Sequence, residues 1–160
     1  MTDFKGLLQA LADAGVEYIL VGGLAAVAHG SARLTQDVDV VYARDPENLA
    51  RLVEALAGLE PYLRGLPPGL PFRWDVETLR HGLNFTLETS LGDLDLLGEI
   101  AGGGRYEALL PRSIELLVFE RTVRCLALDQ LIETKRAAGR PRDLEAIAEL
   151  EALRDLQSED

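Results

Sequence analysis

The sequence predicts an α/β (α+β) fold in which short strands alternate with amphipathic helices. Apolar residues recur at helical spacing over Thr2–Ala14 and Pro46–Gly58, and runs rich in β-branched residues lie between and beyond these segments. From Leu128 onward the pattern is helical. A chain of 160 residues with 48% hydrophobic content suits one ordinary core. We therefore expect a single domain over 1–160, with a C-terminal helical extension over about 127–157.

The N-terminal third begins with a helix, a strand and a second, short helix. The helix over Thr2–Ala14 carries candidate N-capping side chains at its start and is followed by glycine. Glu17–Val21 is rich in Ile, Leu, Val and Tyr, which predicts a strand. This strand ends at Gly22 and Gly23, and a helix of small residues is expected over Leu24–His29.

The next strand, Asp37–Tyr42, has two chemically different faces. Side chains alternate across a strand, so Asp37 and Asp39 share one face. The apolar even-numbered residues from Val38 to Tyr42 share the other and require burial. The strand is therefore expected to pack on the core while its acidic face stays open.

The middle of the chain combines a helix, an irregular stretch and a hairpin. Pro46 suits the first turn of a helix that ends near Gly58. Glu60–Phe72 holds four prolines and is expected to be irregular, either a lid over a site or a simple excursion. Leu83–Thr89 and Asp93–Leu97 alternate as strands and are separated by Gly92, which predicts a hairpin or a sharply bulged pair.

The remaining segments are short and alternate in type. A short helical piece, two strands and two final helices are expected, in order, over 106–110, 114–119, 122–126, 128–138 and 143–156.

Charge and composition exclude several classes of protein. Sixteen Lys and Arg against 27 Asp and Glu give a formal net charge of −11, which argues against a general nucleic-acid coat protein. The single Cys125 cannot form an internal disulfide, and the N-terminus lacks the pattern of a secretory signal. No apolar run approaches the roughly 20 residues of a membrane helix. We expect a cytoplasmic protein that makes no use of a membrane.

Carboxylates on two strands form the first candidate site. Asp37 and Asp39 share a strand face, and Asp93 and Asp95 show the same alternation on a later strand. Hard cations such as Mg²⁺ bind carboxylate oxygens together with substrate phosphates. A metal site formed by the first pair and one of the second pair competes with the simpler interpretation that all four face solvent.

Glycines and a lysine form the second candidate site. Gly22 and Gly23 follow a strand and precede a helix, where the lack of side chains lets backbone N–H groups approach phosphate oxygens. The third glycine of a dinucleotide fingerprint is missing, and the chain has no P-loop. Lys135 is one of only two lysines and follows the inward stripe of its helix. Its ammonium faces either a phosphate site or, by snorkelling, the surface.

These segments, taken in order, resemble the signature of the polymerase-beta-like nucleotidyltransferase superfamily. The resemblance rests on Val21-Gly22-Gly23, His29-Gly30, Arg33, Thr35, Asp37 and Asp39, on Gly92-Asp93-Leu94-Asp95-Leu96-Leu97-Gly98, and on Lys135 with Ala138-Gly139-Arg140, Arg142 and Asp143. The last group is similar to the C-terminal helical motif of small bacterial members, which are minimal and toxin-antitoxin associated proteins.

The resemblance implies a nucleotidyltransferase fold, a mixed β-sheet packed on helices, with two Mg²⁺ ions and an NTP as substrate. It implies that Asp37, Asp39 and Asp95 are catalytic and metal-binding, with Asp95 fitting the family pattern better than Asp93 and acting as general base. Nucleotide binding is implied for Gly22, Gly23, Arg33, Thr35, Lys135 and Arg140.

The function expected from the resemblance is Mg²⁺-dependent transfer of a nucleoside monophosphate to a hydroxyl of a protein, a tRNA or a small molecule. The first alternative is a catalytically inactive protein of this fold that binds a basic partner protein in a toxin-antitoxin type pair. The second is a structural domain whose acids bind stray cations. The oligomeric state, a homodimer included, is left open by the sequence.

Overall fold

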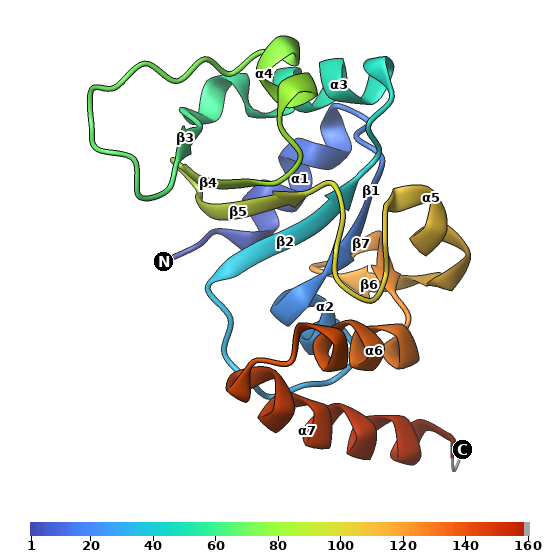
Figure 1. The fold of residues 1–160 in the computed structure, drawn as a ribbon. Coiled ribbons are helices and arrows are strands. Elements are labelled where there is room, and N and C mark those ends of the chain that lie inside the picture. The colour runs from blue at the N-terminus through green and yellow to red at the C-terminus, as the bar shows by residue number, and fades with distance from the viewer. Residues whose placement is uncertain (159–160) are drawn as a thin grey trace.

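A computed structural model describes residues 1–158 and contains a seven-stranded mixed sheet (Figure 1). The strands are β1 Tyr18–Val21, β2 Asp37–Tyr42, β3 Tyr62–Leu63, β4 Phe85–Thr89, β5 Gly92–Leu97, β6 Ser113–Val118 and β7 Arg121–Leu126. Their order across the sheet is β3-β4-β5-β2-β1-β7-β6. The pairs β2–β5 and β1–β7 are parallel, and the other neighbours are antiparallel. The expected α/β class and mixed sheet are confirmed.

Residues 1–158 contain seven α-helices, of which six pack in two groups and α5 contacts β1. They are α1 Phe4–Asp13, α2 Gly22–Ala28, α3 Pro46–Leu56, α4 Val76–His81, α5 Tyr106–Leu109, α6 Leu128–Ala138 and α7 Pro141–Ser158, with 3-10 turns at Ala57–Leu59 and Leu110–Arg112. Helix α3 contacts both α1 and α4, and α6 contacts both α2 and α7. Figure 1 shows the second group at the end of the molecule away from α3 and α4. Among residues 1–158, no helix is both long and apolar enough to cross a bilayer.

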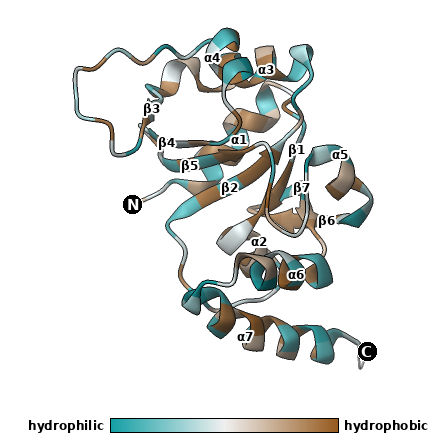
Figure 2. Ribbon diagram, viewed as in Figure 1, coloured by the Kyte–Doolittle hydropathy of each residue, from teal (hydrophilic) through white to brown (hydrophobic). Residues whose placement is uncertain are grey.

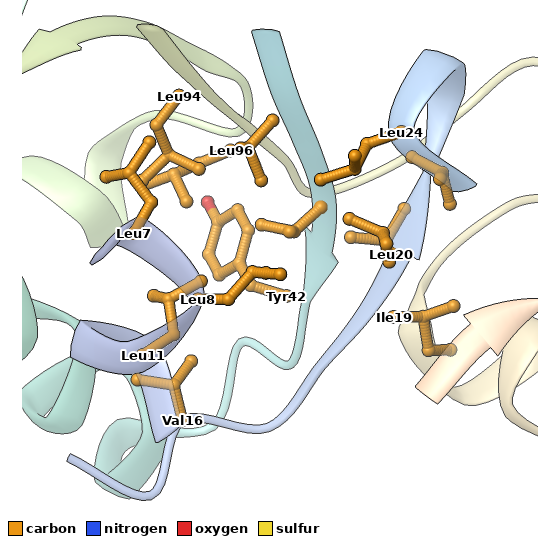
Figure 3. Packing of buried hydrophobic residues seen from close by; sticks show 14 of the residues in the cluster. Leu7, Leu8, Leu11, Val16, Ile19, Leu20, Leu24, Tyr42, Leu94 and Leu96 are labelled. Atoms are coloured by element: carbon orange, nitrogen blue, oxygen red, sulfur yellow. The ribbon is translucent and has the colours of Figure 1, made fainter. Parts of the chain in front are cut away.

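The core lies between α1, α3 and the apolar face of the central strands. Tyr42 of β2 is fully buried, and Figure 3 shows its ring beside Leu7, Leu8 and Leu11 of α1 and close to Leu96 of β5. The hydropathy colouring of Figure 2 shows the same pattern, with apolar residues concentrated in the central strands. The predicted parity of β2 is therefore confirmed, because its even-numbered residues are in the core.

Three local expectations need correction. Helix α2 begins at Gly22 and not at Leu24, so the two glycines are its first turn. Strand β3 lies within the stretch expected to be irregular, because Tyr62 and Leu63 pair with β4. Helix α4 was not expected, although Asp75 caps it by accepting a hydrogen bond from the Thr78 N–H at 2.8 Å.

A buried asparagine joins the start of β1 to the end of β2. The Asn48 side chain, on α3, accepts a hydrogen bond from the Glu17 N–H at 2.7 Å. Its amide donates to the carbonyls of Glu17 and Ala43 at 3.0 and 2.7 Å. Since Asn48 is fully buried, water does not replace these bonds if the side chain is lost.

Replacing this side chain tests its structural role. We expect Asn48→Ala to lower the free energy of unfolding by about 3 kcal/mol, because it leaves buried backbone groups without partners. Urea unfolding followed by circular dichroism measures the change. The control is Glu54→Ala at an exposed position of the same helix, with an expected change below about 0.5 kcal/mol. Equal stabilities of the two variants would contradict the assignment.

Candidate active site

Three carboxylates meet where β2 and β5 run side by side. The two strands are parallel, with Asp39 opposite Asp95 and Asp37 opposite Asp93. One carboxylate oxygen from each of Asp37, Asp39 and Asp95 lies within 4.8 Å of the others, and all three residues are half-buried. The structure therefore groups Asp95, and not Asp93, with the two acids of β2. We call Asp37, Asp39 and Asp95 the acidic triad.

The three carboxylates of the triad repel one another. Burial raises the pKa of Asp39 to about 7, and the charges of Asp95 and Asp37 add to the effect. Burial and the charge of Asp95 also raise the pKa of Asp37. The Oδ1 atom of Asp39 is buried and has no hydrogen-bond partner among the described residues. A cation bound among these oxygens would relieve their mutual repulsion.

The first turn of α2 lies directly against the triad. Gly22 has a φ of +69°, and a Cβ atom there would collide with the Asp39 carboxylate. A Cβ at Gly23 would lie 2.6 Å from the Thr35 Oγ1 atom. Both positions therefore require glycine for space, and Gly22 requires it for backbone conformation too. The glycines bring the backbone of α2 next to the acids.

Two cavities adjoin the acids of β2: Asp39 lines both, Asp37 lines one, and Asp95 lines neither. The apolar cavity, of about 210 Å³, extends toward the segment after β5 and is lined by Val21, Gly22, Asp39, Leu97, Ile100, Ala101, Leu131, Thr134, Lys135, Ala138, Arg140 and Asp143. The charged cavity, of about 270 Å³, extends toward α7 and is lined by Gly22, Gly23, Ala26, Ser31, Arg33, Leu34, Asp37, Asp39, Lys135, Arg140, Arg142, Asp143, Ala146, Glu149 and Leu150. Gly22, Asp39 and Lys135 line both, so the cavities adjoin at these residues.

Lys135 is held at this junction by the turn between α6 and α7. Its side chain is only 19% exposed, and its Nζ lies 4.0 Å from the Asp143 Oδ1. Burial lowers the pKa of Lys135, and the Asp143 charge acts in the opposite direction. Arg140 donates to Asp143 through Nε at 2.6 Å. Lys135 therefore lies inside the site and does not snorkel to the surface.

The other residues expected to bind nucleotide occupy different places. Arg33 lines the charged cavity but is exposed and lies 4.0 Å from Glu145. Thr35 lines neither cavity among the described residues, and its hydroxyl donates to the Asp37 carbonyl at 3.4 Å. The Thr35 side chain thus packs against Gly23 in the first turn of α2.

One residue near the triad was missed from the sequence. Arg64, just after β3, forms an ion pair with Asp95 at 2.7 Å. Its position depends on β3, which lies in a stretch expected to be irregular, so no sequence signal places its guanidinium beside an acid.

Cys125 is buried, and burial raises the pKa of its thiol to about 12. At neutral pH this thiol therefore stays protonated.

The donor set fits a hard divalent cation. It consists of carboxylate oxygens alone, the ligands that Mg²⁺ prefers. The unpartnered Oδ1 of Asp39 is free to accept a cation, and the crowding that raises the pKa of this residue favours one. Residues for a metal site are thus present, and the adjoining cavities leave room for a ligand.

Comparisons with known proteins agree with this geometry at the level of the fold. No family model and no curated protein matches the chain by sequence. The lincosamide antibiotic adenylyltransferase LnuA, solved with lincomycin bound, superposes with a TM-score of 0.62 at 16% identity, over 95% of this chain and 98% of LnuA. TM1012 of Thermotoga maritima, assigned as a nucleotidyltransferase, gives 0.52 at 14% identity, over 100% and 97%.

A third solved structure is a nucleotidyltransferase-like antigenic protein of Paracoccidioides brasiliensis. It superposes with a TM-score of 0.54 at 15% identity, over 98% of this chain and 78% of its own. All three neighbours are named as nucleotidyltransferases or as similar to them. Two of them match this chain along nearly their whole length. The chain therefore has the nucleotidyltransferase fold.

The contact between Gly22 and Asp39 can be tested by adding a methyl group. We expect Gly22→Ala to lower the free energy of unfolding by about 2 kcal/mol, because the alanine is strained at positive φ and collides with the carboxylate. Thermal unfolding measures the loss. Gly58→Ala is the matched control, since a Cβ there meets no atom within 4 Å and φ is not positive. A neutral Gly22→Ala variant would refute the close approach.

The repulsion within the triad predicts a stabilising substitution. We expect Asp39→Asn to raise the stability of the metal-free protein at pH 8 by about 1 kcal/mol, or about 2–4 °C in Tm, because it removes one of three crowded charges. Thermal unfolding in EDTA measures this gain. Asp129→Asn, at an exposed acid, serves as the control. A lower Tm for Asp39→Asn would show that the carboxylates do not repel one another in this way.

Proposed function

We propose that this protein is a nucleotidyltransferase that moves a nucleoside monophosphate from an NTP to a hydroxyl group of an acceptor. The observation that carries the proposal is the acidic triad, in which Asp39 lines both cavities and lies directly against the glycine turn of α2. The fold shared with LnuA and TM1012 supports it. A structural domain with scattered surface acids would not need carboxylates in register on adjacent strands.

Asp37, Asp39 and Asp95 would hold Mg²⁺, two ions by the resemblance described above. Bound Mg²⁺ would polarise the phosphoryl oxygens and offset the charge that develops as pyrophosphate leaves. The crowding of the triad favours loading, because each cation relieves repulsion among the acids. Asp95 lies on the outer strand of the pair, toward β4, and we assign it the additional role of accepting the proton of the attacking hydroxyl.

The charged cavity suits a triphosphate. Lys135 and Arg140 line it from the α6–α7 side, and Arg33 and Arg142 line it from the loop before β2 and from α7. Gly22 and Gly23 line the same cavity, and the start of α2 has no side-chain cap hydrogen bond. These groups would position phosphates next to the triad, where the reacting centre must be held in line.

Among the possible acceptors, the fold comparison favours a small molecule. LnuA acts as an adenylyltransferase on a lincosamide antibiotic and spans the same fold without extra chain length. This chain covers nearly all of LnuA, so we propose a compact acceptor for it too. The net charge of −11 makes a polyanionic acceptor such as a tRNA less favourable.

The experiment offers labelled ATP, CTP, GTP and UTP with Mg²⁺ to small-molecule and protein fractions of a cell lysate and follows label transfer and pyrophosphate release. We expect Asp37→Asn and Asp39→Asn each to reduce transfer by at least about 100-fold, because each removes a metal ligand. Glu88→Gln is the control, since it removes an exposed acid of the adjacent strand outside the triad.

Titration calorimetry with each NTP, with and without Mg²⁺, separates the remaining outcomes. Binding of NTP that needs Mg²⁺ and the triad, with label on an acceptor, supports the transferase. Binding without any transfer would favour the alternative, an inactive protein that acts through a partner. Transfer that survives Asp37→Asn and Asp39→Asn would remove the triad from the mechanism.

A further inference from the structure

Arg64 is fixed at the edge of the sheet, beside the triad, by its backbone. Its N–H donates to the Thr86 carbonyl at 2.9 Å and so continues the pairing of β3 with β4 by one residue. Beyond it the chain turns away at Gly65, which has a φ of +87°. The backbone of Arg64 is therefore held in the sheet, although the residue lies within the proline-rich stretch Glu60–Phe72.

The guanidinium of Arg64 crosses from β3 over β4 to β5. Its Nη2 donates to the Leu87 carbonyl at 2.8 Å and to the Asp95 Oδ1 at 2.7 Å. Its Nε lies 3.5 Å from the Asp93 Oδ2. The side chains of Arg64 and Asp95 are 30% and 17% exposed, so this contact is partly shielded from water. A backbone carbonyl fixes the guanidinium, and the guanidinium in turn restricts the rotation of the Asp95 carboxylate.

We infer that Arg64 is a positioning residue for the proposed metal site. It donates to the Oδ1 of Asp95, and a carboxylate oxygen of Asp95 lies within 4.8 Å of oxygens of Asp37 and Asp39, where a cation shared by the three acids would bind. Without Arg64, repulsion from those two acids would favour rotation of Asp95 toward solvent. This inference rests on the proposed function, because it assigns Arg64 a role only if the triad binds metal.

The competing explanation is that Arg64 stands in for the metal and opposes its binding. The two explanations predict changes of opposite sign. If Arg64 only competed as a charge, its removal would strengthen metal binding, and a lysine would preserve the competition. If Arg64 positions Asp95, both substitutions weaken binding, because lysine lacks the planar fork that reaches Leu87 and Asp95 together.

The test titrates the full-length protein with Mn²⁺ as the probe, by calorimetry and by the electron paramagnetic resonance signal of free Mn²⁺. We expect Arg64→Lys and Arg64→Gln each to weaken Mn²⁺ binding by roughly 10-fold or more, the usual effect of losing a partner that orients a metal ligand. Arg51→Gln is the matched control, since Arg51 lies on α3 and pairs with Glu47 at the surface. It is expected to bind Mn²⁺ as the wild type does.

Chemical rescue separates positioning from a merely structural role. We expect ethylguanidinium to restore part of the Mn²⁺ affinity of Arg64→Gly, whereas ethylammonium at the same concentration restores less. Unchanged affinity in Arg64→Lys and Arg64→Gln, or tighter binding in Arg64→Gln, would overturn the inference while leaving the triad assignment intact. Wild-type binding of Mn²⁺ no stronger than that of Asp39→Asn would instead overturn the proposed function, and the inference with it.

Discussion

The parallel pairing of β2 with β5 is the constraint on which the site depends. Register places Asp39 opposite Asp95, and the alternation of each strand sends their neighbours Val38, Val40 and Leu94 into the core. A shift by one residue would turn the carboxylates into the apolar core and the apolar residues toward the cavities. The core therefore fixes the position of the acids, and packing by α1 and α3 indirectly maintains the geometry of the triad.

The acidic and the basic groups of the site form two separate clusters. The acids of β2 and β5 crowd together, whereas the basic groups Lys135 and Arg140 are tied to Asp143 at the turn between α6 and α7. Asp143 is buried, and although burial alone would raise its pKa, the hydrogen bonds and charge of Arg140 lower it below its ordinary value. It therefore stays ionised and anchors the basic groups. A metal-bound triphosphate would complement both sets of charge, which links the two cavities into one proposed site.

Much of this arrangement was predictable from particular residues. The alternation of Asp37–Tyr42 predicted the strand, its buried face and its acidic face, and all three are observed. The helical stripe through Lys135 predicted that its ammonium points inward. The pairing of the two acidic strands came with the resemblance and not with local pattern, because periodicity assigns a strand its faces but no neighbour. For the same reason the choice of Asp95 over Asp93 stayed open in the residues themselves.

The sequence by itself determined the class of fold, the faces of its strands and the chemical types gathered at the site, because hydrophobic periodicity and residue chemistry are local properties. Only the tertiary structure decided the start of α2 at Gly22, the existence of β3 and the contact of Arg64 with Asp95. Strand β3 is two residues long and is formed by pairing with β4, not by its own propensity. The position of Arg64 follows from that pairing, so contacts between distant segments were needed to bring it to the triad.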